Sequence, residues 1–260
     1  MPPQPARDED TPFFARSFEY ARGEDTGWHS HPHRQLIYAV AGVMTVETHS
    51  GVWVVPSLRA VWIPARTSHR VVMNSRVSMR TAFFDTRRDE LAWGECFVVQ
   101  ISPLMRELLV AATQLSHDAL RGKKGTLICD LAIDELACSQ TLPLNIPQPK
   151  DPRLRRITDA ILAAPSISST FDELGSDAGA SQRTLARLFE SETGLSFRQW
   201  RQQAILLWAL QRLALGASVT SVALDLGYGS PSAFSHMFRK ALGTSPSAYF
   251  TDGSVGFPSP

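Results

Sequence analysis

The 260-residue sequence contains no run of about 18 consecutive apolar residues, so it predicts no transmembrane helix. Its N-terminus, MPPQPARDEDTPFF, lacks the basic and apolar segments of a signal peptide, which favours the cytoplasm. Its three cysteines are scattered and lack CxxC spacing, which argues against a disulfide framework or a zinc knuckle. Neither a Ser-His-Asp arrangement nor a glycine-rich phosphate loop is recognisable in the chain.

Charge of one sign is not in excess either. The net charge of the chain is +1. Residues 151–250 hold ten Arg or Lys and eight Asp or Glu, a net charge of +2. Bulk charge therefore does not predict nucleic-acid binding. Such a prediction has to be based on motif geometry and on the positions of individual arginines.

The texture of the sequence changes along the chain and predicts an α+β protein with more than one domain. Short β-rich segments such as QLIYAV, GVWVVP and HRVVMN are separated by turn residues, a pattern typical of an antiparallel sandwich or a small barrel. Helical periodicity follows, with Ser102-Pro103 as a predicted helix start. The predicted organisation is a loose tail at 1–12, a β-rich domain at 13–100, helices at 101–140, a stiff proline-rich linker at 141–152, a helical domain at 153–250 and a second tail at 251–260.

The helical domain contains two segments that predict helix-turn-helix units. In the first, a short helix from Phe171 to Ala178 leads through Gly179 to a second helix capped by Ser181. In the other, Val219–Leu226 leads through Gly227 to a helix that Ser230 caps. The units are in register 48 residues apart, and SFRQWRQQAILLWALQRLALG between them predicts one long connecting helix. The second helices of the two units, held apart by this connecting helix, can enter successive major grooves of a DNA duplex.

The segments RTLARLFESETGLSFRQWRQQ and VALDLGYGSPSAFSHMFRKALGTSPSAYF resemble the DNA-binding domain of the AraC/XylS family of transcriptional regulators. The resemblance implies base reading by Arg183 and Arg187 in the first unit and by Ser232 and His236 in the second, with arginine suited to guanine. The DNA-binding candidates are Gln182, Arg183, Arg187, Ser196, Arg198, Ser232, Ser235, His236, Arg239 and Lys240. Ser196, Arg198, Arg239 and Lys240 are expected to hold phosphates.

The stretch HSHPHRQ followed by Gly42 resembles the first cupin motif, HxHxxxE…G, with Gln35 in place of the glutamate. PARTSHRVVMN resembles the second motif, with Arg66 in place of its glycine. The resemblance implies a barrel whose cavity receives His29, His31, Gln35 and His69, whereas His33 is out of register and is expected to face away. Converging imidazoles can bind Zn, Ni, Fe or Mn, but an organic effector without a metal is an equal alternative.

The whole arrangement resembles cupin-bearing AraC-family regulators that control export of foreign compounds, so regulation of a transporter gene is one expectation. Family relatives often dimerise through a helix after the barrel, which makes Leu104, Leu108 and Leu109 candidates for a homodimer contact; packing of this helix on the barrel is the alternative. The expected partners are double-stranded operator DNA, a small-molecule effector and, for an activator, RNA polymerase. The sequence leaves activator and repressor open.

A ligand-responsive regulator without enzymatic activity is the favoured function. The alternative is a metal-dependent cupin enzyme, dioxygenase- or isomerase-like, fused to a DNA-binding module. The missing cupin glutamate and the fused helix-turn-helix domain argue against it. A third alternative is a DNA-binding architectural protein with a barrel that binds nothing, against which the intact HxH argues.

Overall fold

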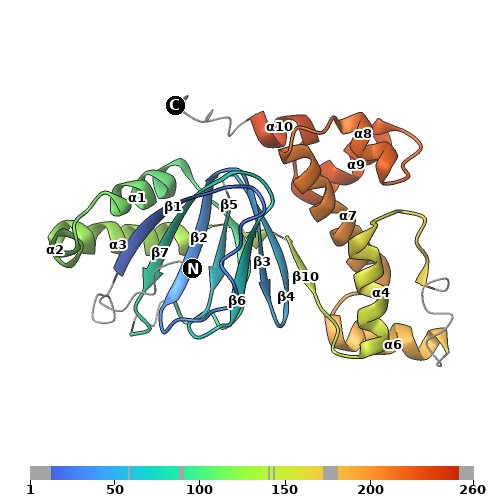
Figure 1. Cartoon of the computed structure of the whole chain (residues 1–260), viewed down its shortest axis with the longest axis horizontal. Coiled ribbons are helices and arrows are strands. Elements are labelled where there is room, and N and C mark those ends of the chain that lie inside the picture. The colour runs from blue at the N-terminus through green and yellow to red at the C-terminus, as the bar shows by residue number, and fades with distance from the viewer. Residues whose placement is uncertain are drawn as a thin grey trace. The chain divides into compact units, whose positions relative to one another are not determined.

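The computed structural model describes residues 13–57, 59–87, 91–139, 141–142, 144–171 and 181–251. The described chain forms two compact units. The first holds residues 13–48 and 53–142, and the second holds residues 49–52 and 144–251. Figure 1 shows a β-rich N-terminal half and a helical C-terminal half, as the sequence predicts. No helix in these described ranges is long and apolar enough to cross a membrane.

Two antiparallel sheets form the barrel. The six-stranded sheet has the order β1 (Phe13–Tyr20), β7 (Val77–Phe84), β2 (Arg34–Ala41), β5 (Arg59–Ile63), β8 (Phe97–Gln100) and β9 (Thr141–Leu142). The other has the order β10 (Asn145–Pro147), β4 (Gly51–Pro56), β3 (Val43–Thr48) and β6 (His69–Met73). Side chains of β6 alternate between buried and half-buried, which is the pattern of a strand with one face on a core.

Three helices pack beside β1 and β7: α1 (Pro103–Thr113), α2 (His117–Arg121) and α3 (Lys123–Ala137) (Figure 1). Ser102 caps α1 by accepting a hydrogen bond from the Met105 N–H, so the predicted helix start is found. The five-residue helix α2 was not predicted from the sequence. Leu109 and Met105 of α1 join a core with Phe84 and Trp62, which explains the apolar stripe of this helix.

The second unit contains α4 (Pro152–Ala163), α6 (Gln182–Thr193), α7 (Phe197–Ala214), α8 (Val219–Asp225), α9 (Pro231–Leu242) and α10 (Pro246–Thr251). The long connecting helix predicted between the two helix-turn-helix units is α7. Every helix from α6 to α9 is preceded by an N-cap serine whose side chain accepts a hydrogen bond from a backbone N–H. Serines therefore recur at the helix starts in this half of the chain.

The segment at 141–152 is more structured than the linker predicted there. It is extended, but parts of it form β9 and β10, and Pro152 already begins α4. The Gln148 N–H donates to the Ser50 carbonyl, and the Trp200 indole N–H donates to the Pro147 carbonyl at 2.7 Å. Proline has no backbone N–H, so this segment is held by hydrogen bonds from proline carbonyls and from the N–H groups of its other residues.

Candidate sensor cavity and DNA-reading helices

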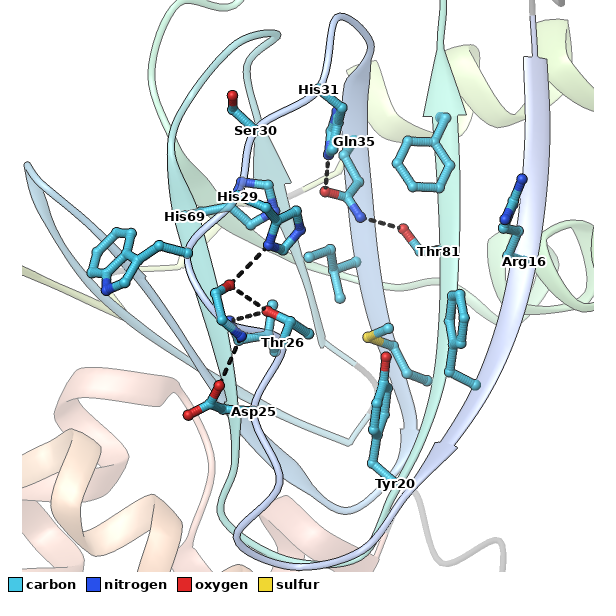
Figure 2. A pocket seen from close by; sticks show the side chains of 17 residues that line it. Arg16, Tyr20, Asp25, Thr26, His29, Ser30, His31, Gln35, His69 and Thr81 are labelled. Carbon is cyan, nitrogen blue, oxygen red and sulfur yellow. Dashed lines mark hydrogen bonds between the residues drawn. The ribbon is translucent and has the colours of Figure 1, made fainter. Parts of the chain in front are cut away.

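A cavity of about 670 Å³ in the first unit receives all four polar residues predicted to meet in the barrel. His29 lies before β2 and pairs with His69 at the start of β6, through backbone hydrogen bonds of 3.0 and 2.9 Å in both directions. His31 also precedes β2, and Gln35 lies within that strand. Figure 2 shows the three imidazoles grouped at one end of the cavity, with Gln35 beside His31.

Backbone carbonyls fix the orientation of each imidazole. Nδ1 of His29 lies 2.9 Å from the Gly27 oxygen, and Nδ1 of His69 lies 2.9 Å from the Thr67 oxygen. Nδ1 of His31 lies 3.0 Å from the His33 oxygen. Because a carbonyl only accepts, Nδ1 of His29 and Nδ1 of His69 carry the proton, and the Nε2 atoms of these two rings are left with their lone pairs. Metal-binding histidines are commonly oriented by such a bond on the other ring nitrogen.

The three histidines can supply one ligand atom each within 4.8 Å of one another. His69 is fully buried, and Nε2 of this residue has no hydrogen-bond partner in the described structure. A buried lone pair without a donor costs free energy unless another species meets it. The geometry and the nitrogen donor set therefore fit a divalent transition metal.

Burial keeps the cluster in the form that ligates metals. Burial lowers the pKa of His69 to about 4. Burial is also the main cause that lowers the pKa of His31, against the opposing effect of its hydrogen bonds. The His69 ring is therefore neutral at physiological pH, with the lone pair of its Nε2 available.

Gln35 occupies the position of the cupin glutamate and is itself held in place. Oε1 of Gln35 lies 2.7 Å from Nε2 of His31, and Nε2 of Gln35 donates to Oγ1 of Thr81 at 2.8 Å. Gln35 is 5% exposed, so this network is shielded from water. The side chain that replaces the carboxylate thus links β2 to β7 and brings no charge to the site.

Three further positions of the cupin motifs, one of them a departure, have structural consequences. Arg66, where the motif has glycine, adopts a left-handed backbone with φ +61°, and its N–H donates to the His31 carbonyl. Gly42 keeps the motif residue at φ +90°, and a Cβ there would lie 2.1 Å from the Arg76 carbonyl oxygen. Asn74 accepts a hydrogen bond from Thr45 at 2.7 Å and helps to hold the β3–β6 end of the barrel.

Other histidines and aromatics of the barrel have different places. His33 stays out of the cavity, as predicted, but it is buried edge-on against Phe14 at 5.2 Å. His49 and His117 are exposed. Trp28 lines the cavity and is 48% exposed, so it lies at the rim. Met44, Trp53, Trp62 and Phe84 are buried core residues of the first unit.

Sequence reasoning missed one wall of the cavity. Arg16, Phe18 and Tyr20 of β1 line it, as do Met79, Thr81 and Phe83 of β7. Each set is spaced by two residues, which is the strand period that puts side chains on one face. The two-residue period of these strands shows in the sequence which side chains share a face. It does not show which face of a strand borders a cavity.

The second helix of the first helix-turn-helix unit is α6. Ser181 accepts from the Thr184 N–H, and Gly194 ends the helix at φ +70°. Leu185 and Phe189 are buried. Gln182, Arg183 and Arg187 are exposed on the other side. The preceding helix was predicted at 171–178, and its part from residue 172 lies outside the described residues, together with Gly175 and Gly179.

The second helix-turn-helix unit has the predicted elements, α8 and α9, around a turn at Gly227 with φ +82°. Phe234 and Phe238 are fully buried. The exposed candidates are Ser232, His236, Arg239 and Lys240. Ser235 is half-buried rather than outward-facing, because it follows Phe234 at the edge of the buried stripe.

The two phosphate candidates at the start of α7 differ in their surroundings. Ser196 is the N-cap of α7, where it forms a capping box with Gln199. Its hydroxyl is therefore engaged in the helix start, while Arg198 is exposed two positions later.

The dimerisation candidates divide into buried and exposed residues. Leu109 is 1% exposed and Leu108 packs against the same core, so the prediction that these two face a partner is wrong. The stripe of α1 instead packs on the barrel. Leu104 remains on the surface with 46% exposure, and Leu127 and Leu131 of α3 are 59% and 40% exposed.

Comparisons with known proteins agree with both halves of the structure. Residues 16–84 match the cupin domain model, and residues 174–252 match a helix-turn-helix domain model. The chain is 34% identical over 221 residues to the HTH-type transcriptional regulator NimR of Escherichia coli, which covers 85% of this chain and 81% of NimR. The HTH-type transcriptional regulator RipA of Corynebacterium glutamicum is 32% identical over 110 residues, 42% of this chain and a 33% share of RipA.

Among solved structures, ToxT from Vibrio cholerae aligns with 94% of this chain and 99% of its own, at 11% identity and a TM-score of 0.40. The helix-turn-helix and cupin matches, together with the likeness to NimR over most of both chains, establish the family. The chain belongs to the AraC/XylS family of DNA-binding transcriptional regulators and carries a cupin domain ahead of its helix-turn-helix domain.

Proposed function

We propose that this DNA-binding regulator is a sensor, in which a divalent metal and a small molecule bind in the cupin cavity and change operator binding. The observation that carries the proposal is the set of three imidazoles, each with Nδ1 bound to a backbone carbonyl and a ligand atom within 4.8 Å of the others. His29, His31 and His69 would hold the metal, which would supply open coordination positions for an effector.

The regulatory effect follows from differential affinity. A ligand shifts a conformational equilibrium only as far as it binds one state more tightly than the other. The cluster joins β6 to the segment before β2, so ligand binding there biases the conformation of the barrel. We propose that the cavity acts in this way and performs no turnover of its ligand.

Elemental analysis of untagged protein tests the metal. We expect near-stoichiometric Zn, Ni, Fe or Mn in the wild type and its loss in the double variant His29→Ala/His31→Ala. His49→Ala is the matched control, because His49 is an exposed histidine outside the cavity. Wild-type protein without metal would contradict the metal site and leave an organic effector as the ligand of the cavity.

We also propose that the regulator is a homodimer and that α3 supplies its contact. The exposed stripe of α3 contains Lys124, Leu127, Leu131 and Asp134. If two copies pair antiparallel about an axis level with residue 129, Leu127 meets the partner's Leu131 and Lys124 meets the partner's Asp134. One two-fold axis thus satisfies both the apolar and the charged pairs, which is what a self-complementary interface requires.

Sedimentation of matched variants tests this face. Lys124→Glu should weaken dimerisation about tenfold, and the double variant Lys124→Glu/Asp134→Lys should restore it by exchanging the charges across the axis. Leu104→Asp is the control on α1, where the leucine is equally exposed. Dissociation by Leu104→Asp, with α3 variants still dimeric, would move the interface to α1.

We propose, from the sequence resemblance to cupin-bearing AraC-family regulators of export, that the regulated gene encodes a transporter for a foreign compound. Transcription from the promoter of a transporter gene that the protein binds, with and without the protein in the presence of RNA polymerase, tests this and separates activation from repression. Unchanged transcription of that gene in a deletion strain would contradict the proposal.

A further inference from the structure

Gln35 leaves the histidine cluster without a negative charge. A carboxylate at this position would neutralise half the charge of a divalent ion, but the amide of Gln35 neutralises none. The three imidazoles are neutral ligands as well. An ion held by these residues would keep its full +2 charge in a site where His69 is fully buried and Gln35 is 5% exposed.

No other side chain in the cavity compensates for that charge. Among the described residues that line the cavity, only Arg16 and Asp25 carry a full charge, and their signs cancel. The Asp25 carboxylate accepts a hydrogen bond from the Gly27 N–H at 2.7 Å and lies 3.9 Å from Nη1 of Arg70. It is therefore already engaged at the exposed edge of the site (Figure 2).

The wall next to the cluster is apolar. Phe83 stands edge-on to the His31 ring at 5.0 Å, so the apolar surface begins directly beside a proposed metal ligand. The rest of this wall consists of Phe18, Ile37, Val71 and Met79. A cavity of about 670 Å³ is in the range that encloses small organic ligands.

We propose that the effector of this cavity is a small organic anion, with its anionic group at the histidine-bound metal and its apolar body on the Phe83 wall. This rests on the proposed metal site and adds the chemical class of the ligand. A buried charge that the protein does not neutralise favours a ligand of opposite sign, since the attraction is strongest where water is excluded.

Cobalt(II) provides the probe, because its visible absorption reports changes in its ligands without any activity assay. The full-length protein is loaded with Co²⁺ and titrated with benzoate, with azide and with benzamide, the neutral isostere of benzoate. We expect azide and benzoate to shift the spectrum, and benzamide to bind at least tenfold more weakly than benzoate. Metal-free protein should bind benzoate at least tenfold more weakly than the Co²⁺ form.

Two variants at one position isolate the charge. Gln35→Glu should raise Co²⁺ affinity and weaken benzoate binding at least tenfold, since the protein then supplies the negative charge itself. Gln35→Met removes the same amide without adding charge and should weaken benzoate binding by less than threefold. Equal weakening by the two variants would overturn the proposal, because it would assign the effect to the lost hydrogen bonds.

The remaining outcomes separate this inference from the metal site. Failure of Co²⁺ to bind would overturn both. Co²⁺ binding with no spectral response to benzoate or azide, or with equal affinity for benzamide and benzoate, would retain the metal site and overturn the anionic effector.

Discussion

The indole N–H of Trp200 donates a 2.7 Å hydrogen bond to the carbonyl oxygen of Pro147. The bond joins β10 to α7, the helix between the two helix-turn-helix units. Trp200 is fully buried, and its ring stands edge-on to Phe189 of α6 at 5.9 Å. Close to it in the sequence, the Glu192 carboxylate accepts hydrogen bonds from the backbone N–H groups of Lys150 and Asp151. The segment entering α4 is therefore held by both α6 and α7.

Trp200→Phe should lower the free energy of unfolding by about 1–3 kcal/mol, because it removes a buried donor and leaves the Pro147 carbonyl without it. Urea unfolding of the full-length protein measures the effect. Trp208→Phe is the matched control on the same helix, since Trp208 is half-buried and its ring lies 5.5 Å from the Arg212 guanidinium carbon. Equal losses in the two variants would mean that the bond to Pro147 adds nothing specific.

Arg187→Ala should weaken binding to the specific operator by about 1–3 kcal/mol, the usual worth of one bidentate contact to a base. Arg187 is exposed on α6, opposite the buried Leu185 and Phe189, and the family resemblance assigns it to base reading. Titrations of operator and random-sequence DNA at one salt concentration provide the measurement. If both DNAs lose equal affinity, Arg187 contacts phosphate rather than a base.

Gly42→Ala should lower the free energy of unfolding by at least about 2 kcal/mol, because the left-handed backbone at φ +90° disfavours any side chain and a Cβ would meet the Arg76 carbonyl at 2.1 Å. Gly94→Ala is the control, since a Cβ at Gly94 would have no neighbour within 4 Å. Thermal unfolding compares them. A Gly42→Ala protein as stable as the Gly94→Ala protein would show that the turn relaxes around the new methyl group.

Much of the helical half could be predicted because its signals are local. The helix that Ser230 was predicted to cap is α9 (Pro231–Leu242), and Gly243 ends it at φ +77°. The long helix α7 was predicted for the same reason. Caps and the 3.6-residue period need only neighbouring residues, so one sequence suffices to find them.

The parts that could not be predicted depend on distant partners. Gln35 and Thr81 are 46 positions apart, and the sequence predicts the strand of each without predicting their hydrogen bond. The stripe of α1 was recognised, but periodicity does not say what covers it, and Leu109 proved to be a core residue. β10 was missed because a proline-rich segment gives little strand signal.

Asp151 provides a test of pH dependence in the second unit. It is the N-cap of α4 and accepts hydrogen bonds from the Arg153 backbone at 2.8 Å and from its guanidinium at 2.8 and 3.0 Å. The Arg153 side chain is the main cause that lowers the pKa of Asp151 to about 2. Because the folded-state pKa lies below the usual value, the unfolded state binds the proton more readily. The stabilisation is complete above about pH 4 and is lost as the pH falls towards 2.

Asp151→Asn and Asp151→Ala separate the charge from the cap. Asparagine caps helices about as well as aspartate, so Asp151→Asn should keep the helix start and lose only the charge, whereas alanine should lose both. The unfolding midpoint of Asp151→Asn should lie below that of the wild type at pH 6, and the difference should become smaller as the pH falls from 4 to 2.5. The deficit of Asp151→Ala should persist in part at low pH, because the missing cap is independent of protonation. A wild-type advantage over Asp151→Asn that stays constant from pH 6 to 2.5 would rule out the charged pair with Arg153 as its source.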